Sequence, residues 1–158
     1  MKKNASGFSL IELLIVVAII LIIAAIAIPN LLRSRMAANQ ASAVGSMRTI
    51  NTSEVTYATT YPTGYSPDLV SLGPPSSGNP VATAAGLIDS VLAAGTKSGY
   101  SFTYATSAVN NRNDTYTLSA APTTAGTTGT NYYFTDQTGV IRQNSTAAAS
   151  ASDSPIGG

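Results

Sequence analysis

The sequence predicts an α+β protein in which a long N-terminal α-helix, its first half membrane-spanning, packs on a small antiparallel β-sheet. The first observation is an uncharged, nearly all apolar run from Leu13 to Leu32, which continues into a weaker helical pattern. The second is a series of four short segments near the C-terminus that are rich in Thr, Tyr, Phe and Val and are separated by turn residues. One helix followed by closely spaced strands favours a sheet packed on the second half of that helix.

The apolar run from Leu13 to Leu32 predicts a membrane span. As a helix it would rise roughly 30 Å, which is about the thickness of the hydrocarbon core of a bilayer. No polar stripe interrupts it before Ile28, so a helix lying flat on a membrane surface does not fit. Lys2 and Lys3 precede it, which leaves a secretory signal peptide as an alternative, although the apolar part of a signal peptide is shorter.

Glu12 is the one charged residue at the start of this run. Ser9 and Glu12 have the S-x-x-E spacing of a capping box, and an acid in the first turn of a helix interacts favourably with the helix dipole. A simple membrane anchor carrying an unrelated head gives Glu12 no role. Capping and a second role, described next, can coexist if the helix begins near Phe8 or Ser9.

The N-terminal residues resemble those of type IV prepilins and pseudopilins. A short basic leader ends in Ser6-Gly7, the apolar sequence begins at Phe8, and Glu12 is the fifth residue after Gly7. Pro29 matches the proline that such pilins carry near the end of the apolar stretch. The close resemblance covers Lys2 to Leu32, and beyond it only the layout of a helix followed by a sheet is shared.

This resemblance implies processing and assembly. A prepilin peptidase is expected to cut between Gly7 and Phe8, removing a leader of residues 1–7, and to methylate the new amine of Phe8. In a filament, the carboxylate of Glu12 would then pair with the Phe8 amine of a neighbouring subunit. Such a pair sets which subunit lies beside which, while apolar burial supplies the bulk of the attraction.

Residues 8–33 are thus expected to form the transmembrane and assembly helix, and Pro29 is expected to disturb it. Proline lacks a backbone donor, and its ring clashes with the carbonyl of Ala25, so the helix should kink or open locally there. The resemblance implies that this stretch loses helix on assembly. The alternative is a simple bend at the membrane surface, where Arg33 and Arg35 reach lipid headgroups.

The helix is predicted to continue over residues 34–61 and into the head. Its buried face is predicted from apolar residues at helical spacing, namely Val44, Met47, Ile50, Val55, Ala58 and Tyr61. Glu54 falls within the same arc, so we expect it to accept a hydrogen bond from the head backbone or to lie at the edge of this face.

Residues 62–144 are predicted to form the globular head. We expect a helical turn over Ser66–Leu72 that starts at Pro67, a loop over residues 73–80 and a short helix over Ala84–Ala94. The four predicted strands are Tyr100–Ala105, Thr115–Ala120, Asn131–Thr135 and Val140–Gln143, and residues 145–158 are predicted to be a flexible tail.

The composition excludes many kinds of chemistry. The chain has 158 residues, with no Cys and no His, a net charge of +1 and only 9% charged residues. Catalysis and metal binding by His or Cys are therefore impossible, and no catalytic motif is present, so we expect no enzymatic activity, cofactor or metal site. Asp136 is the best calcium candidate, but a lone carboxylate matches such a site poorly. Many pilins close their C-terminal region with a disulfide, which this chain cannot form, so sheet pairing alone should hold its last strands.

The resemblance implies a structural subunit of a type IV pilus-like filament, and the runner-up is a pseudopilin of a type II secretion system. The expected partners are copies of the chain itself, prepilin peptidase, the inner-membrane assembly machinery and, before assembly, membrane lipid; the small basic excess gives no reason to expect nucleic acid. The precursor would cross the inner membrane once, and the subunit would end in an extracellular pilus, or in a periplasmic filament if it is a pseudopilin. A membrane-anchored enzyme or binding head is the third hypothesis.

Overall fold

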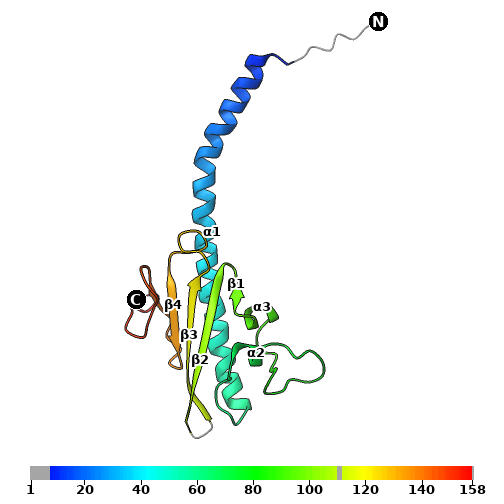
Figure 1. Ribbon diagram of the computed structural model, residues 1–158, viewed down its shortest axis with the longest axis vertical. Helices are drawn as coiled ribbons and strands as arrows, with labels where there is room; N and C mark the ends of the chain where they lie inside the picture. Colours follow the sequence, from blue (N-terminus) through cyan, green and yellow to red (C-terminus); the bar gives the residue numbers. More distant parts are fainter. Residues whose placement is uncertain (1–7, 110–111, 158) are drawn as a thin grey trace. The chain divides into compact units, whose positions relative to one another are not determined.

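The computed structural model describes residues 8–109 and 112–157. The chain divides into two compact units with a boundary between Arg35 and Met36, and each is described by itself. The predicted α+β class is confirmed, because helix α1 (Leu10–Thr60) is followed by a five-stranded antiparallel sheet (Figure 1).

The sheet consists of strands in simple sequence order, each antiparallel to the next. Their bounds are β1 Thr96–Lys97, β2 Tyr100–Val109, β3 Arg112–Pro122, β4 Tyr132–Asp136 and β5 Arg142–Asn144. Three of the predicted strands lie within or overlap β2, β3 and β4, and the fourth overlaps β5. Strand β1 was not predicted, since two residues carry no alternation that could reveal a strand.

The second unit has its hydrophobic core between α1 and the sheet. Met47 and Ile50 from α1 and Leu118 from β3 are completely buried there. Asn51 joins the two layers, because its side-chain oxygen accepts from the Tyr116 hydroxyl (3.0 Å) and its amide nitrogen donates to the Thr135 hydroxyl (3.1 Å). The head is therefore held by a packed apolar layer with a polar bridge at its centre.

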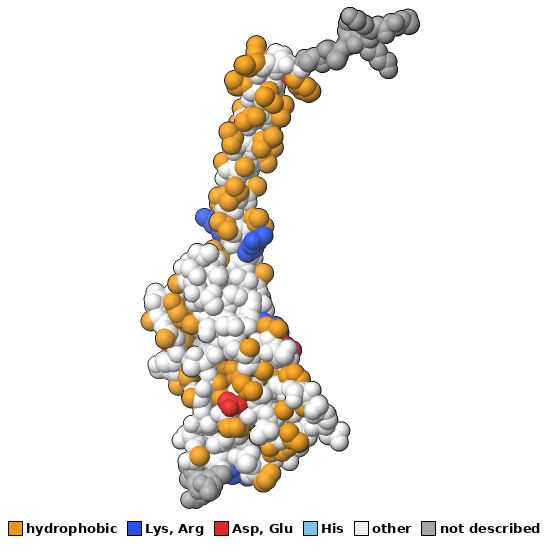
Figure 2. Space-filling model, turned by 45° about the vertical axis from the view of Figure 1, so that its right-hand side comes forward, with side chains coloured by type: hydrophobic (Ala, Val, Ile, Leu, Met, Phe, Trp, Pro, Cys, Tyr) orange, Lys and Arg blue, Asp and Glu red, His pale blue; other side chains and the backbone are white. Residues whose placement is uncertain are grey.

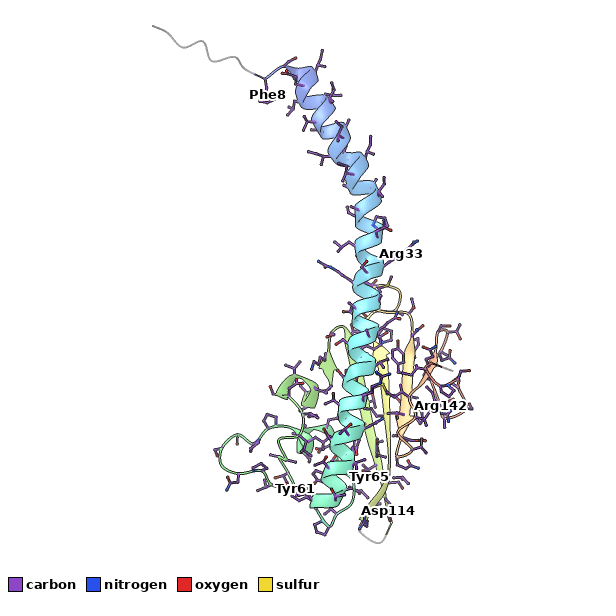
Figure 3. All side chains as sticks on the ribbon, turned by 180° about the vertical axis from the view of Figure 1, so that it is seen from behind. Phe8, Arg33, Tyr61, Tyr65, Asp114 and Arg142 are labelled. Atoms are coloured by element: carbon purple, nitrogen blue, oxygen red, sulfur yellow. The ribbon has the colours of Figure 1, made fainter. Side chains whose placement is uncertain are left out.

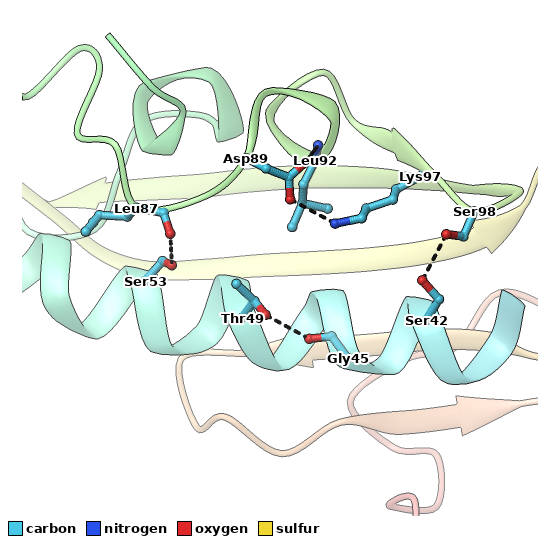
Figure 4. A network of polar contacts seen from close by, with 9 residues as sticks. All are labelled: Ser42, Gly45, Thr49, Ser53, Leu87, Asp89, Leu92, Lys97 and Ser98. Carbon is cyan, nitrogen blue, oxygen red and sulfur yellow. Dashed lines mark hydrogen bonds and ion pairs between the residues drawn. The ribbon is translucent and has the colours of Figure 1, made fainter. Parts of the chain in front are cut away.

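The buried face of α1 differs from the predicted one. It comprises Ala43, Ser46, Met47, Ile50, Ser53, Glu54 and Tyr57, at spacings of three and four residues. Val55, which was predicted to lie on this face, is 60% exposed. The prediction was wrong here because three of the buried residues are polar. A prediction from apolar residues alone therefore placed the buried face on the wrong side of the helix. Ser53 is buried because its hydroxyl donates to the Leu87 carbonyl (3.1 Å; Figure 4).

The two short helices are shorter than predicted. Helix α2 is Leu69–Leu72 and helix α3 is Ser90–Ala93. Each starts after an aspartate whose carboxylate accepts from a backbone amide three residues on, Asp68 from Ser71 (2.8 Å) and Asp89 from Leu92 (3.0 Å). Pro67 therefore precedes the cap of α2 rather than starting the helix.

Residues 84–88, which were predicted to be helical, are not part of α3. Their backbone amides instead donate to carbonyls at the end of α2: Ala85 to Ser71, Gly86 to Gly73, and both Leu87 and Ile88 to Leu72, at 2.8–3.0 Å. These contacts between distant segments replace the local helical bonds that the apolar pattern had suggested.

The C-terminal segment folds back on β5. The Gln143 amide donates to the Ser154 carbonyl (3.0 Å), and the Ile156 amide donates to the Ile141 carbonyl (2.9 Å). The segment after residue 144 contains no helix or strand in its described part, yet its backbone is bonded at the edge of the sheet.

Asp153 closes this segment with its side chain. One carboxylate oxygen accepts from the side-chain amide of Asn144 (2.9 Å). The other accepts from the backbone amide (2.7 Å) and the hydroxyl (2.9 Å) of Ser150. The Asp153 carbonyl accepts from the Arg142 guanidinium (2.9 Å). We call this set of contacts the Asp153 clasp. The expectation that sheet pairing alone holds the final strands is therefore wrong.

Replacing Asp153 with Ala should loosen the C-terminal segment while leaving the sheet folded. The variant loses three hydrogen bonds to the carboxylate, so the amides of residues 145–157 should exchange with solvent several-fold faster, on the order of tenfold. Hydrogen exchange read by mass spectrometry tests this. Ser145→Ala, at an exposed position of the same segment, is the control and should leave exchange unchanged.

Candidate functional site

The first unit exposes an apolar helix surface. An 18-residue stretch of α1 has a mean hydropathy of 3.3, and none of it is buried. Phe8 is 85% exposed, and hydrophobic side chains extend along the visible face of this part of α1 in Figure 2 and around it in Figure 3. By length and composition this is the one described helix that could cross a membrane. A single copy in water would leave this surface uncovered, so lipid or protein must cover it.

Glu12 caps the start of α1. Its carboxylate accepts a hydrogen bond from the Ser9 backbone amide (2.9 Å), and the Leu13 amide donates to the Ser9 carbonyl (3.2 Å). The capping interaction predicted from the S-x-x-E spacing is therefore present. Phe8 lies just outside the helix, which begins at Leu10. Gly7, the predicted cleavage residue, lies outside the described residues.

Pro29 lies within α1, which continues through it as helix. Proline has no amide to donate to the Ala25 carbonyl, so one helical hydrogen bond is missing at this point. The Ser34 hydroxyl donates to the Asn30 carbonyl (3.0 Å) one turn later. The structure describes the helix without the local opening proposed for the assembled state, and both that opening and the kink stay predictions.

The head has a shallow hollow of about 350 Å³ between α1 and the segment from α3 to β1. It is lined by Ser42, Gly45, Ser46, Thr49, Asp89, Leu92 and Lys97. Figure 4 shows that its polar groups are bonded to one another: the Lys97 amine to the Asp89 carboxylate (2.8 Å) and the Ser42 hydroxyl to the Ser98 hydroxyl (2.9 Å). These groups stabilise the fold of the head, and the hollow presents no arrangement of a nucleophile and a base.

Asp136, the calcium candidate, is occupied within its own turn. One of its carboxylate oxygens accepts from the backbone amide (2.9 Å) and the hydroxyl (2.5 Å) of Thr138. Over the described residues, no group of three or more acidic, His or Cys side chains lies close enough to hold a metal ion. Asp136 therefore serves as a turn residue between β4 and β5.

Two polar features were not predicted from the sequence, namely the Asp153 clasp and the complete burial of Glu54. Glu54 is completely buried; it accepts from the Ser66 amide (2.9 Å), and its other carboxyl oxygen lies within hydrogen-bond distance of the Ser66 hydroxyl (2.6 Å). The first of the two expectations for Glu54, a bond from the head backbone, is thus confirmed. Its full burial had no signal in the sequence beyond its place among apolar neighbours.

Comparisons with known proteins give one family match and one similar pilus protein. The prokaryotic N-terminal methylation motif matches residues 2–28. The type IV wide pilus major component PilA4 of Thermus thermophilus is 68% identical over 37 residues, which are 23% of this chain and 28% of that protein. No solved structure matches the chain.

The chain thus covers less than a third of the length of that pilus component. The matched residues include Gly7, Phe8 and Glu12, on which the resemblance to prepilins depends. The N-terminal segment thus carries the prokaryotic methylation motif and is similar to a segment of a type IV pilus component.

Proposed function

We propose that the chain is a structural subunit of a type IV pilus-like filament, made as a membrane-anchored precursor and polymerised through α1. The observation that carries this proposal is the combination of the methylation motif with an apolar helix segment of which no residue is buried. The similarity to a major pilus component of Thermus thermophilus supports a pilus rather than a secretion filament.

The proposed assembly moves the apolar part of α1 from lipid to the interior of a filament. Lipid tails are as apolar as the side chains of Leu and Ile, so this transfer gains little from the hydrophobic effect and depends on close packing between helices. The register between neighbouring subunits is then decided by contacts that can form in only one arrangement of their helices. Glu12 is the charged group available for this in the described part of the apolar segment.

We assign that role to a pair between Glu12 and the amine of Phe8 on a neighbouring subunit. Cleavage after Gly7 would create this amine, and each charge would be costly to bury alone. The bond from the Ser9 amide uses one carboxylate oxygen of Glu12, and a carboxylate has room for further donors. Capping within the chain and pairing between chains are therefore compatible.

Prepilin peptidase and the inner-membrane assembly machinery are the further partners of this proposal, with membrane lipid around α1 before assembly. The precursor would cross the inner membrane with its leader in the cytoplasm, and the processed subunit would end in an extracellular fibre. Loss of helix around Pro29 would let the segment lengthen during assembly, since the Ala25 carbonyl already lacks its helical donor.

Gly7→Val should abolish processing. The proposal places the peptidase cut after Gly7, where a branched side chain would hinder the approach of a protease, so the variant chain should keep residues 1–7. Mass spectrometry of the N-terminus measures this, with the natural chain expected to begin at methylated Phe8. A natural chain that keeps Met1 or begins beyond the apolar run would overturn the proposed function.

The location of the filaments distinguishes a pilus subunit from a pseudopilin. Electron microscopy of cells, with mass spectrometry of sheared material, should find long surface fibres that contain this chain. A short periplasmic filament whose loss blocks protein secretion would instead assign the chain to a type II secretion system.

A further inference from the structure

Glu54 is a buried acid without a cation. Its side chain is completely inaccessible to solvent in the head. The ion pairs among the described residues are Lys97 with Asp89 and Arg112 with Asp114, so neither involves Glu54. A carboxylate in this position would hold an uncompensated charge away from water, which is costly.

Ser66 is the residue through which Glu54 is bonded. The Ser66 hydroxyl oxygen lies 2.6 Å from the Glu54 carboxyl oxygen Oε1 and 3.0 Å from the Asp68 carbonyl. The Tyr104 hydroxyl lies 3.3 Å from the Ser66 hydroxyl oxygen and donates to the Ser66 carbonyl (3.0 Å). A serine hydroxyl has one proton, so it can donate to only one of the oxygens around it.

The protonation state of Glu54 decides how this one proton is used. If Glu54 is ionised, the Ser66 hydroxyl must donate to it, and the Asp68 carbonyl loses that donor. If Glu54 is neutral, its own O–H donates to the Ser66 hydroxyl oxygen, and the Ser66 proton is free for the Asp68 carbonyl. The neutral acid thus allows the Ser66 hydroxyl to bond to both Glu54 and the Asp68 carbonyl, whereas the ionised acid allows only the bond to Glu54.

We propose that Glu54 is a neutral carboxylic acid in the folded head near neutral pH, and that its proton latches the connection over residues 61–68 onto α1. The same connection is bonded to β3, since the Tyr65 amide donates to the Asn113 carbonyl (2.9 Å) and the Asn113 amide donates to the Thr63 carbonyl (2.8 Å). These contacts thus join the end of α1 to the start of β3, the central strand of the sheet. Ionisation of Glu54 would weaken the attachment of this connection to α1, which runs through Glu54 and Ser66.

The groups facing Glu54 support a neutral state. They are Tyr57 from α1, Tyr104 from β2 and Tyr116 from β3. None of the three carries a positive charge, so none can stabilise a carboxylate by its charge. Burial raises the pKa of Glu54 above its ordinary value of 4.5, against the opposing effect of the bonds from Ser66.

The raised pKa fixes the sign of the pH dependence. Between the ordinary pKa and the raised one, the folded head binds a proton that the unfolded chain does not bind. The stabilisation by this group is therefore fully present below the ordinary value of 4.5 and is lost as pH rises through the folded-state pKa.

Carbon NMR of the full chain in detergent micelles tests the proposal directly. The chain contains two glutamates, Glu12 and Glu54, so labelling the side-chain carboxyl carbon of Glu gives two signals. The signal that disappears in Glu54→Gln belongs to Glu54, and Glu12→Gln gives the same assignment by the opposite loss. We expect the Glu54 signal to keep the chemical shift of a neutral acid between about pH 4 and 7, where an ordinary glutamate ionises. A Glu54 signal that titrates in that range would overturn the proposal.

Thermal unfolding gives a second readout. Gln has the shape of the neutral acid and can also donate to the Ser66 hydroxyl and accept from the Ser66 amide. Glu54→Gln should therefore match the natural chain in unfolding temperature near neutral pH and should exceed it increasingly as pH is raised. A variant that is markedly less stable than the natural chain near neutral pH would show that the charge of Glu54 was stabilising, which contradicts the proposal. This test does not depend on whether the chain forms filaments.

Discussion

Glu12→Gln is expected to lower the affinity between subunits by more than ~100-fold and so to remove nearly all filaments. Leaving the Phe8 amine buried without its partner costs about 3–5 kcal/mol for each subunit added, and 1.4 kcal/mol corresponds to a tenfold change in affinity. The amide oxygen of Gln can still accept from the Ser9 backbone amide, as it does in capping boxes generally. The variant thus removes the charge and keeps the cap.

The yield of sheared filaments, divided by the total amount of chain in the cells, measures this effect. Mass spectrometry should show that the variant is still cut before Phe8 and methylated, because cleavage depends on the leader. Ser9→Ala is the matched control: it keeps the backbone amide that Glu12 caps and should assemble normally. Filaments at the natural yield from cleaved Glu12→Gln would rule out the pairing.

Leu118→Ala should strongly destabilise the head. Leu118 is completely buried on β3, where it lies between Tyr104 of β2 and Thr135 of β4. Truncating a buried leucine to alanine costs about 2–5 kcal/mol, since it removes apolar contacts and leaves a cavity. The unfolding temperature of the head should fall by on the order of 10 °C.

Circular dichroism of the full chain in detergent, followed during heating, measures this change. Thr117→Ala is the control, because Thr117 is the neighbouring residue on β3 and is exposed. Its cost should stay within about 0.5 kcal/mol, as for most surface substitutions. Equal losses from the two variants would mean that the core does not lie on the α1 side of β3 as described.

The features that the sequence predicted well are local ones. The apolar run before Pro29, the cap from Glu12 to Ser9 and the strands around Leu118 each follow from neighbouring residues or from a short period in the sequence. The same is true of the motif that begins before Phe8, whose meaning lies in a contiguous set of residues. These elements could be placed without knowing where the rest of the chain runs.

The features that the sequence did not reveal depend on contacts between distant residues. Ser53 and Glu54 are buried because Leu87 and Ser66 supply their partners, and nothing in the helical period marks a polar residue as internal. Val55 was placed inside for the converse reason, since an apolar residue on a helix carries no sign that it faces water. The pairing between Glu12 and another chain is not tested by the structure of one chain.

The way in which the C-terminal segment is closed has a consequence for where this head can mature. A sulfur bridge would require an oxidising compartment and an enzyme to make it, whereas the contacts of Asp153 form as soon as the chain folds. Thiol reductants should therefore leave the C-terminal segment bonded to β5. The hydrogen bond from Ser150 lowers the pKa of Asp153 below its ordinary value of 3.8. The contribution of the carboxylate is thus present above that value and disappears only in stronger acid, as pH falls through the folded-state pKa.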